Sequence, residues 1–231
     1  LALIGWGAMI LADFASEEIK SEVLPKVVKG EIKLSFSLTE PGSGSDAASL
    51  QTKARRDGDD YVISGQKLYS SGAHAPNNMI VLAARTNPDV KKHAGISLFL
   101  VPNDLPGITI NRLDVVGRRI LGLCEVFFDD VRLPSRMLIG EENSGWKYIN
   151  KHLERERILL AANYLGNARA ALDDAVRYAG ERKQFGKAIA EFQAIGHMLA
   201  DMATDIEAAR WITASTAWRY DQGLPCVKQA C

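Results

Sequence analysis

The pattern of apolar residues changes near residue 140, and this change constrains the fold more than any other feature of the sequence. Residues 32–139 hold short runs of β-branched and aromatic residues, separated by turn-forming Gly, Pro, Asn and Asp. Residues 144–223 instead carry apolar residues at three- and four-residue spacing, which is typical of long helices. Strands followed by helices, without alternation, predict separate β and α layers or domains and argue against a Rossmann unit.

Six runs in the central zone have the composition of strands and are bounded by turn residues. They are residues 34–38, 60–64, 79–83, 96–101, 108–110 and 126–128. Short strands at this spacing predict an antiparallel sandwich or barrel.

Helices are predicted on both sides of the strand zone. Before it, Ser16 followed by two glutamates is typical of a helix start, and Gly30 suits a helix end. After it, alanine-rich apolar stripes predict two long helices, near residues 145–181 and 189–222, that pack as in a bundle. The predicted fold class is therefore α+β: a helical segment, a central antiparallel β-barrel or sandwich domain, and a C-terminal helical bundle.

Charge and composition exclude several functional classes. Lys plus Arg and Asp plus Glu are equal at 28 each, so no net field favours nucleic acid or an acidic membrane. The longest apolar runs are too short to span a bilayer. The four histidines have no partner residues at ligand spacing, so no metal site is expected. Walker, nucleophile-elbow and Ser-His-Asp patterns are absent from the sequence.

The cysteines and the chain ends bear on the setting of the protein. Cys124, Cys226 and Cys231 have neither zinc spacing nor a disulfide-framework pattern, which favours reduced thiols in a cytosolic or matrix-like compartment. The chain begins with Leu rather than Met and stops after a helical pattern without a closing element. We therefore expect it to be cut at both ends.

The ten residues SLTEPGSGSD, 37–46, combine backbone freedom with four hydroxyl side chains at the end of a predicted strand. Gly42 and Gly44 expose their N–H groups without a Cβ in the way, so this loop could donate hydrogen bonds to a polar planar ring or a phosphate. The alternative from composition alone is a surface turn capped by Asp46.

Tyr69 and Ser71 form a second candidate pair, in which Tyr69 stacks on a ligand ring and Ser71 bonds its edge. The alternative is a strand with Tyr69 in the core and the neighbouring serines outside.

The charged stretch at residues 154–157 forms a third candidate. Successive helical residues point about 100° apart, so these four charges cannot share one face. Leu153 and Leu160 mark the predicted buried stripe, and Glu156 and Arg157 flank it. A carboxylate beside an apolar face can have its pKa raised by desolvation, which suits a general base. The alternative is a solvated face with i,i+4 pairing.

The order of these motifs is more specific than any one of them. The ordered motifs are Thr39–Asp46, Gly65–Lys67 with Tyr69, Phe127–Pro134, Glu181–Gly186 and Phe192-Gln193. Because of these motifs, the sequence resembles the acyl-CoA dehydrogenase family over essentially the whole chain. The resemblance implies three parts: residues 1–31 as the end of an N-terminal helical domain, 32–140 as a flavin-binding middle β domain, and 141–231 as the first part of a C-terminal helical bundle.

The resemblance also implies FAD as the cofactor. The residues it assigns to the flavin are Phe36, Leu38, Thr39, Gly44, Ser45, Tyr69 and Ser71. Tyr69 and Ser71 stand where the family commonly has tryptophan and threonine. Arg182 would reach the FAD pyrophosphate of a neighbouring subunit, with Gln184, Phe185 and Gln193 nearby, because a guanidinium fork matches phosphate oxygens. The resemblance therefore implies a homo-oligomer, either a dimer or a tetramer.

The implied reaction is α,β-dehydrogenation of an acyl-CoA thioester, in lipid and fatty acid metabolism. Most members carry the general base in the last third of the chain. A minority, including isovaleryl- and long-chain-type enzymes, carry a glutamate on the first helix of the C-terminal bundle, 26 residues before the arginine that matches Arg182, and this position is Glu156. Substrate contacts would come from Arg157, Glu154 and Ser45.

The resemblance further implies an electron-transfer flavoprotein as acceptor, and a bacterial cytoplasm or a mitochondrial matrix as location. Open alternatives are an acyl-CoA oxidase, an enoyl-CoA reductase or a flavin monooxygenase of the same superfamily. A non-catalytic binding or assembly fragment is a further alternative. The residues do not indicate the length or branching of the acyl chain.

Overall fold

A computed structural model describes residues 2–117 and 119–230, with side chains from Gly7 onward. Leu1, Arg118 and Cys231, the last of the three cysteines discussed above, lie outside the described residues. The chain divides into two compact units, Leu1–His152 and Leu153–Cys231. In the first unit Cys124 is free and buried, and in the second Cys226 is free and buried.

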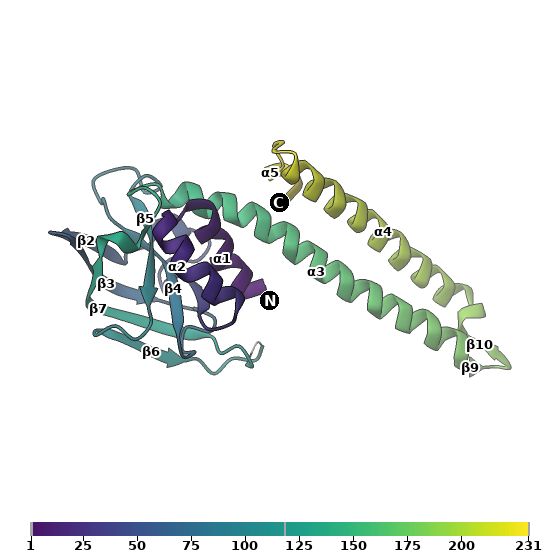
Figure 1. Cartoon of the computed structure of the whole chain (residues 1–231). Coiled ribbons are helices and arrows are strands. Elements are labelled where there is room, and N and C mark those ends of the chain that lie inside the picture. Colours follow the sequence, from purple (N-terminus) through teal and green to yellow (C-terminus); the bar gives the residue numbers. More distant parts are fainter. Residues whose placement is uncertain (1, 118, 231) are drawn as a thin grey trace. The chain divides into compact units, whose positions relative to one another are not determined.

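The first unit is built on one eight-stranded sheet (Figure 1). Its strands are β1 (Lys33–Ser37), β2 (Lys53–Asp57), β3 (Asp60–Lys67), β4 (Asn78–Arg85), β5 (Ile96–Pro102), β6 (Ile108–Arg112), β7 (Cys124–Pro134) and β8 (Leu138–Ile139). The main path runs β6-β7-β3-β2-β4-β5-β8, and β1 pairs with β4 beside that path. The predicted central β domain is confirmed.

Two features of the sheet differ from the sequence-based expectation. β1 pairs with β4 in parallel over five residue pairs, whereas most other pairings are antiparallel. β2 was not predicted, because its sequence KARRD buries only Ala54 and so lacks an apolar pattern. It forms because antiparallel pairing with β3, from Lys53↔Ser64 to Asp57↔Asp60, satisfies its backbone.

The core of the sheet lies along β4 and β5. Val81 to Ala84 and Leu98 to Val101 are fully buried. Tyr61 of β3 packs edge-on against Phe99 of β5, with 4.8 Å between the ring centroids. Strands that are buried on both faces read as continuous apolar runs, which explains why these two were the clearest strands in the sequence.

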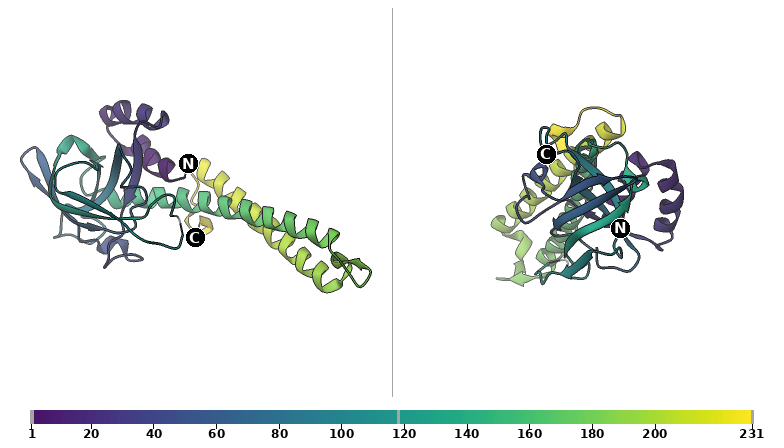
Figure 2. Two further views of the ribbon diagram at one scale, coloured as in Figure 1. Left: turned by 90° about the horizontal axis from the view of Figure 1, so that it is seen from below. Right: turned by 90° about the vertical axis from the view of Figure 1, so that its left-hand side faces the viewer.

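Helices α1 (Ala2–Phe14) and α2 (Glu17–Val28) lie together on one side of the sheet (Figure 2). α1 packs closely on β1, since a Cβ added at Gly7 would lie 2.8 Å from Cβ of Leu34. The predicted helix start is confirmed: Ser16 is the N-cap of α2, and its Oγ accepts a hydrogen bond from Ile19 N at 3.3 Å. Gly30, with φ +76°, follows the helix end as predicted.

Replacing Ser16 by Ala should lower the free energy of unfolding of the complete protein by about 1 kcal/mol, because the amide of Ile19 loses its acceptor. Urea denaturation measures this change. Ser21→Ala in the same exposed helix is the matched control and should stay within about 0.5 kcal/mol of the wild type. Equal losses at both positions would refute the capping role.

The second unit continues α3 (Gly145–Glu181), whose first turns belong to the first unit. Beyond it come the two-residue strands β9 (Lys183–Gln184) and β10 (Lys187–Ala188), then α4 (Gln193–Asp221) and α5 (Val227–Ala230). α4 returns antiparallel to α3, and Arg155 Nε donates a hydrogen bond to Tyr220 Oη at 3.1 Å near the open end. The two long predicted helices are confirmed.

Large apolar side chains of this helical hairpin are exposed in the single chain. More than two fifths of the surface of each is accessible in Tyr164, Val176, Tyr178, Met198, Met202, Trp211, Ile212 and Trp218. Two helices cannot bury apolar residues on several faces, so the hairpin has the character of part of a larger bundle.

Candidate functional site

The loop that follows β1 lies beside the segment that follows β3. Leu68 N donates a hydrogen bond to Thr39 O at 2.8 Å, and the hydroxyls of Ser37 and Ser70 share a buried hydrogen bond of 2.6 Å. Residues about thirty positions apart in the sequence are thereby brought together. Of the predicted flavin residues, Phe36 lies in β1, Leu38 and Thr39 lie in the loop after it, and Tyr69 and Ser71 lie in the second segment.

Tyr69 points away from the protein interior. Its backbone is in the left-handed region, with φ 60°, and 54% of its side chain is exposed, while Ser70 and Ser71 are buried. The alternative of a core tyrosine with exposed serines is therefore wrong. β3 ends at Lys67, and the left-handed backbone two residues later turns the ring outward. Such a conformation costs energy in a non-glycine residue and is common at binding sites.

The glycine-rich loop has an open side. A Cβ added at Gly42 or Gly44 would meet no described heavy atom within 4 Å, so packing within this chain does not require glycine at either position. Ser45 is exposed beside them. Ser43 is buried instead, and its Oγ has no hydrogen-bond partner among the described residues. Open backbone amides and exposed hydroxyls fit a ligand that lies along the loop.

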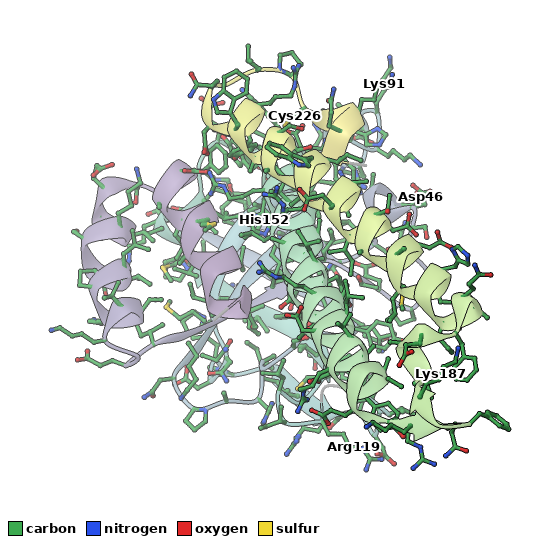
Figure 3. All side chains as sticks on the ribbon, turned by 90° about the vertical axis from the view of Figure 1, so that its right-hand side faces the viewer. Asp46, Lys91, Arg119, His152, Lys187 and Cys226 are labelled. Carbon is green, nitrogen blue, oxygen red and sulfur yellow. The ribbon has the colours of Figure 1, made fainter. Side chains whose placement is uncertain are left out.

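Asp46 does not cap a plain turn. As N-cap of the short 3₁₀ helix Ala47–Ser49 it makes no side-chain hydrogen bond to the helix backbone. Its carboxylate accepts hydrogen bonds from Ser49 Oγ and from Lys92 Nζ, which together hold its pKa below the ordinary value. Asp46, labelled in Figure 3, therefore anchors the end of the loop to the side chains of Lys92 and Ser49.

A buried ion pair lies directly beneath this loop. Lys67 is fully buried, Glu40 is 7% exposed, and Lys67 Nζ lies 2.8 Å from Glu40 Oε1. Burial raises the pKa of Glu40, but the charge and hydrogen bond of Lys67 outweigh burial and keep that pKa below its ordinary value. Burial lowers the pKa of Lys67 to about 8, although the Glu40 carboxylate opposes this shift. Sequence reasoning gave neither residue a role.

Phe36 faces the first turns of α3. Its ring centroid lies 6.0 Å from that of His152, which is buried near the N-terminal end of the helix. Tyr148 and Ile149 are buried on the preceding turn. This stretch of α3 therefore belongs to the packing around the end of β1.

Four predicted cofactor residues gather at the connection between α3 and α4 in the second unit. Arg182 follows α3, Gln184 lies in β9, and Gln193 begins α4, and all three are exposed. Phe185, with φ 50° and 94% exposed, forms the tip with Gly186, near Lys187 in Figure 3. A group so exposed in the single chain is available to another molecule.

The predicted base Glu156 lies near the other end of the same helix, with the predicted substrate residues Glu154 and Arg157. Glu154 and Glu156 are partly buried, and Arg157 is exposed. Burial and the nearby Glu154 carboxylate raise the pKa of the buried thiol Cys226. The 26 residues from Glu156 to Arg182 correspond to about 39 Å of helix at 1.5 Å per residue. Glu156 and Arg182 of one chain therefore cannot contact the same part of a ligand.

Among the described residues, no group of three or more His, Cys, Asp and Glu side chains could hold a metal ion. Within residues 2–117 and 119–230, none of the helices combines the length and apolarity that crossing a bilayer requires.

Comparison with known proteins places these features in a family. Residues 35–131 match the family model "Acyl-CoA dehydrogenase, middle domain", and residues 143–231 match "Acyl-CoA dehydrogenase, C-terminal domain". The "Probable acyl-CoA dehydrogenase YngJ" of Bacillus subtilis is 42% identical over 231 residues, which cover 99% of this chain and 60% of that protein.

Other relatives carry names with different substrates. The "Cyclohexane-1-carbonyl-CoA dehydrogenase" of Geobacter metallireducens is 38% identical over 97% of this chain and 58% of its own length. The solved structure of butyryl-CoA dehydrogenase from Megasphaera elsdenii aligns with a TM-score of 0.91 and 35% identity, over 99% of this chain and 60% of that one. The chain thus spans about three fifths of the length of these relatives.

Proposed function

Because this chain belongs to the acyl-CoA dehydrogenase family, we propose that the complete protein is an FAD-dependent oxidoreductase that dehydrogenates an acyl-CoA thioester between its α and β carbons. The observation that carries the proposal is the match of both family models, in order, to the unit that holds the glycine-rich loop and to the helices that follow it. We assign residues 1–31 to the end of an N-terminal helical domain, 32–140 to the middle domain and 141–231 to the start of the C-terminal bundle.

The first unit offers a fit for the flavin ring. The open loop side at Gly42 and Gly44, the exposed Ser45 and the outward Tyr69 ring support the proposal of a planar ligand beside Thr39. Backbone and hydroxyl groups of Leu38 and Thr39 would hold the edge of the ring, with Phe36, Gly44 and Ser71 nearby. The chemistry that FAD supplies when bound is acceptance of the hydride from the β-carbon of the substrate.

Glu156 is proposed as the base that removes the α-proton of the thioester. That proton is weakly acidic, so the base must act in a pocket that excludes water and beside groups that polarise the thioester oxygen. Arg157 and Glu154, within one turn of Glu156 on α3, are proposed as substrate contacts, and Ser45 is proposed as a further one. The support is positional: Glu156 is partly buried on α3 and matches the glutamate of a minority of the family.

The cofactor site is proposed to be shared between two subunits. Arg182, Gln184, Phe185 and Gln193 gather about 39 Å along α3 from Glu156, and all four are exposed in the single chain. They would therefore bind the FAD pyrophosphate of a neighbouring subunit, in a dimer or tetramer. Acyl-CoA as substrate, an electron-transfer flavoprotein as acceptor, and a bacterial cytoplasm or mitochondrial matrix as location remain predictions for the complete protein.

Anaerobic titration of the purified complete protein with a panel of acyl-CoAs tests this function. We expect a yellow protein whose visible flavin absorbance bleaches with at least one saturated acyl-CoA, with straight- and branched-chain members of the panel distinguished by rate. A colourless protein that FAD does not reconstitute would contradict the proposal. Oxygen consumption without an electron-transfer flavoprotein would favour an oxidase, and reduction of an enoyl-CoA without any bleaching by saturated acyl-CoAs would favour a reductase.

A further inference from the structure

We propose that the buried Glu40–Lys67 ion pair is a positioning device that fixes the backbone of residues 38–40 against the flavin. This inference rests on the proposed function, because it assigns the pair to the FAD site. Neither residue touches the ring in this assignment. Both act through the peptide groups and side chains that do.

Burial is the first reason to expect a role beyond stability. Lys67 and Glu40 are 0% and 7% exposed, so both charges have lost nearly all contact with water. Desolvation of two charges offsets most of their attraction, and apolar residues of similar volume often stabilise a fold equally well. A pair that contributes little net stability can still select one backbone geometry, as buried polar groups do in some folds.

The contacts of Lys67 give the geometry. Its ammonium donates to Leu38 O at 3.0 Å and to Glu40 Oε1 at 2.8 Å. Thr39, between these two residues, is held by Leu68 N, which donates to Thr39 O at 2.8 Å. Three consecutive residues of the candidate flavin segment are thus tied to two consecutive residues at the end of β3.

Glu40 extends the arrangement past the glycine-rich loop to the two residues just before β2. Its carboxylate accepts hydrogen bonds from Gln51 N at 2.6 Å and from Thr52 N at 2.9 Å. The backbone groups of Glu40 and Ser43 also exchange two hydrogen bonds, at 3.0 and 3.1 Å. A loop with glycines at positions 42 and 44 has high conformational entropy. The Glu40 side chain restricts it, because it ties the residues before the glycines to the residues after them.

A second cationic side chain, Arg85, lies near the pair. Burial is the largest cause of the lowered pKa of Lys67, and the repelling charge of Arg85 lowers it further. Arg85 itself donates to Ala48 O at 2.7 Å and to Leu50 O at 3.3 Å. The loop is therefore held by charged side chains at both ends, and Lys67 is the one that also binds the residue before Thr39.

The test compares Lys67→Met with the double variant Glu40→Gln/Lys67→Met in the complete protein. Lys67→Met leaves the buried Glu40 carboxylate without its cation and should lower the melting temperature, whereas the double variant removes both charges and should recover part of that loss. FAD dissociation constants, measured by flavin fluorescence, should rise at least tenfold in both. The visible absorption band of the bound flavin should also shift in the double variant.

Each outcome decides the inference. A double variant that is more stable than Lys67→Met but still binds FAD weakly supports positioning. A double variant with wild-type stability, FAD affinity and spectrum overturns it and leaves the pair a structural role. Arg132→Met, which removes an exposed 2.7 Å ion pair with Asp57 in the same unit, should leave FAD affinity unchanged. A wild-type protein that fails to bind FAD refutes the proposed function instead.

Discussion

Replacing Glu156 by Gln should slow the reduction of bound flavin by acyl-CoA about a thousandfold, while FAD stays bound. A positioned general base contributes about 10²- to 10⁴-fold to a proton transfer, and the amide of Gln cannot accept the α-proton. The change keeps the size and hydrogen-bonding reach of the side chain, so the helix and the partly buried site should persist. Anaerobic stopped-flow at saturating substrate measures the rate constant directly.

Glu154→Gln is the matched control on the same helix. Two residues along a helix correspond to a rotation of about 200°, so Glu154 faces a different direction from Glu156. We expect weaker binding of acyl-CoA in this variant, with a rate at saturation near that of the wild type. Fast flavin reduction in Glu156→Gln would show that the base is another carboxylate of the complete protein.

Replacing Gly65 by Ala should destabilise the protein by about 3 kcal/mol or more, from overpacking and backbone strain together. Gly65 lies at a register shift between β3 and β7 and has φ +149°, a conformation that residues with a Cβ rarely adopt. An added Cβ would lie 2.7 Å from both Cα and Oγ1 of Thr52. Because Thr52 N donates to Glu40, its displacement would also disturb the ion pair and weaken FAD binding.

Gly58→Ala is the control for this second prediction. Gly58 also has a positive φ, of 64°, but no described heavy atom lies within 4 Å of an added Cβ. Its loss of stability should be about 1 kcal/mol, from backbone strain alone. The difference between the two variants in urea denaturation measures the clash, and equal losses would contradict the close approach of β3 to Thr52.

The predictable parts of the fold are those with a strong local pattern. The capped start of α2 and the two long helices could be predicted because caps and helical periodicity are local signals. The buried strands β4 and β5 could be predicted because each is a continuous run of apolar residues, which is also a local signal. β2 could not be predicted, since its residues are mostly charged and its pairing partners supply the order.

The candidate site was only half visible in the sequence. The glycine-rich loop and Tyr69 are conspicuous by composition, but the direction of the Tyr69 ring depends on a left-handed backbone that no local pattern announces. The Glu40–Lys67 pair was missed because its members are 27 residues apart and each is ordinary in its own context. The burial of Lys67 at the end of β3, which requires a partner of opposite charge, is visible only in the structure.

The length of α3 has a consequence for how defects would spread through an assembly. Suppose that each chain contributes Arg182 to the site of its neighbour and uses Glu156 in its own site. A chain without Glu156 and a chain without Arg182 can then complement each other. An assembly of Glu156-deficient and Arg182-deficient protomers would still contain centres composed entirely of intact halves. Assemblies that mix the two variants should then show activity that assemblies of either variant alone lack.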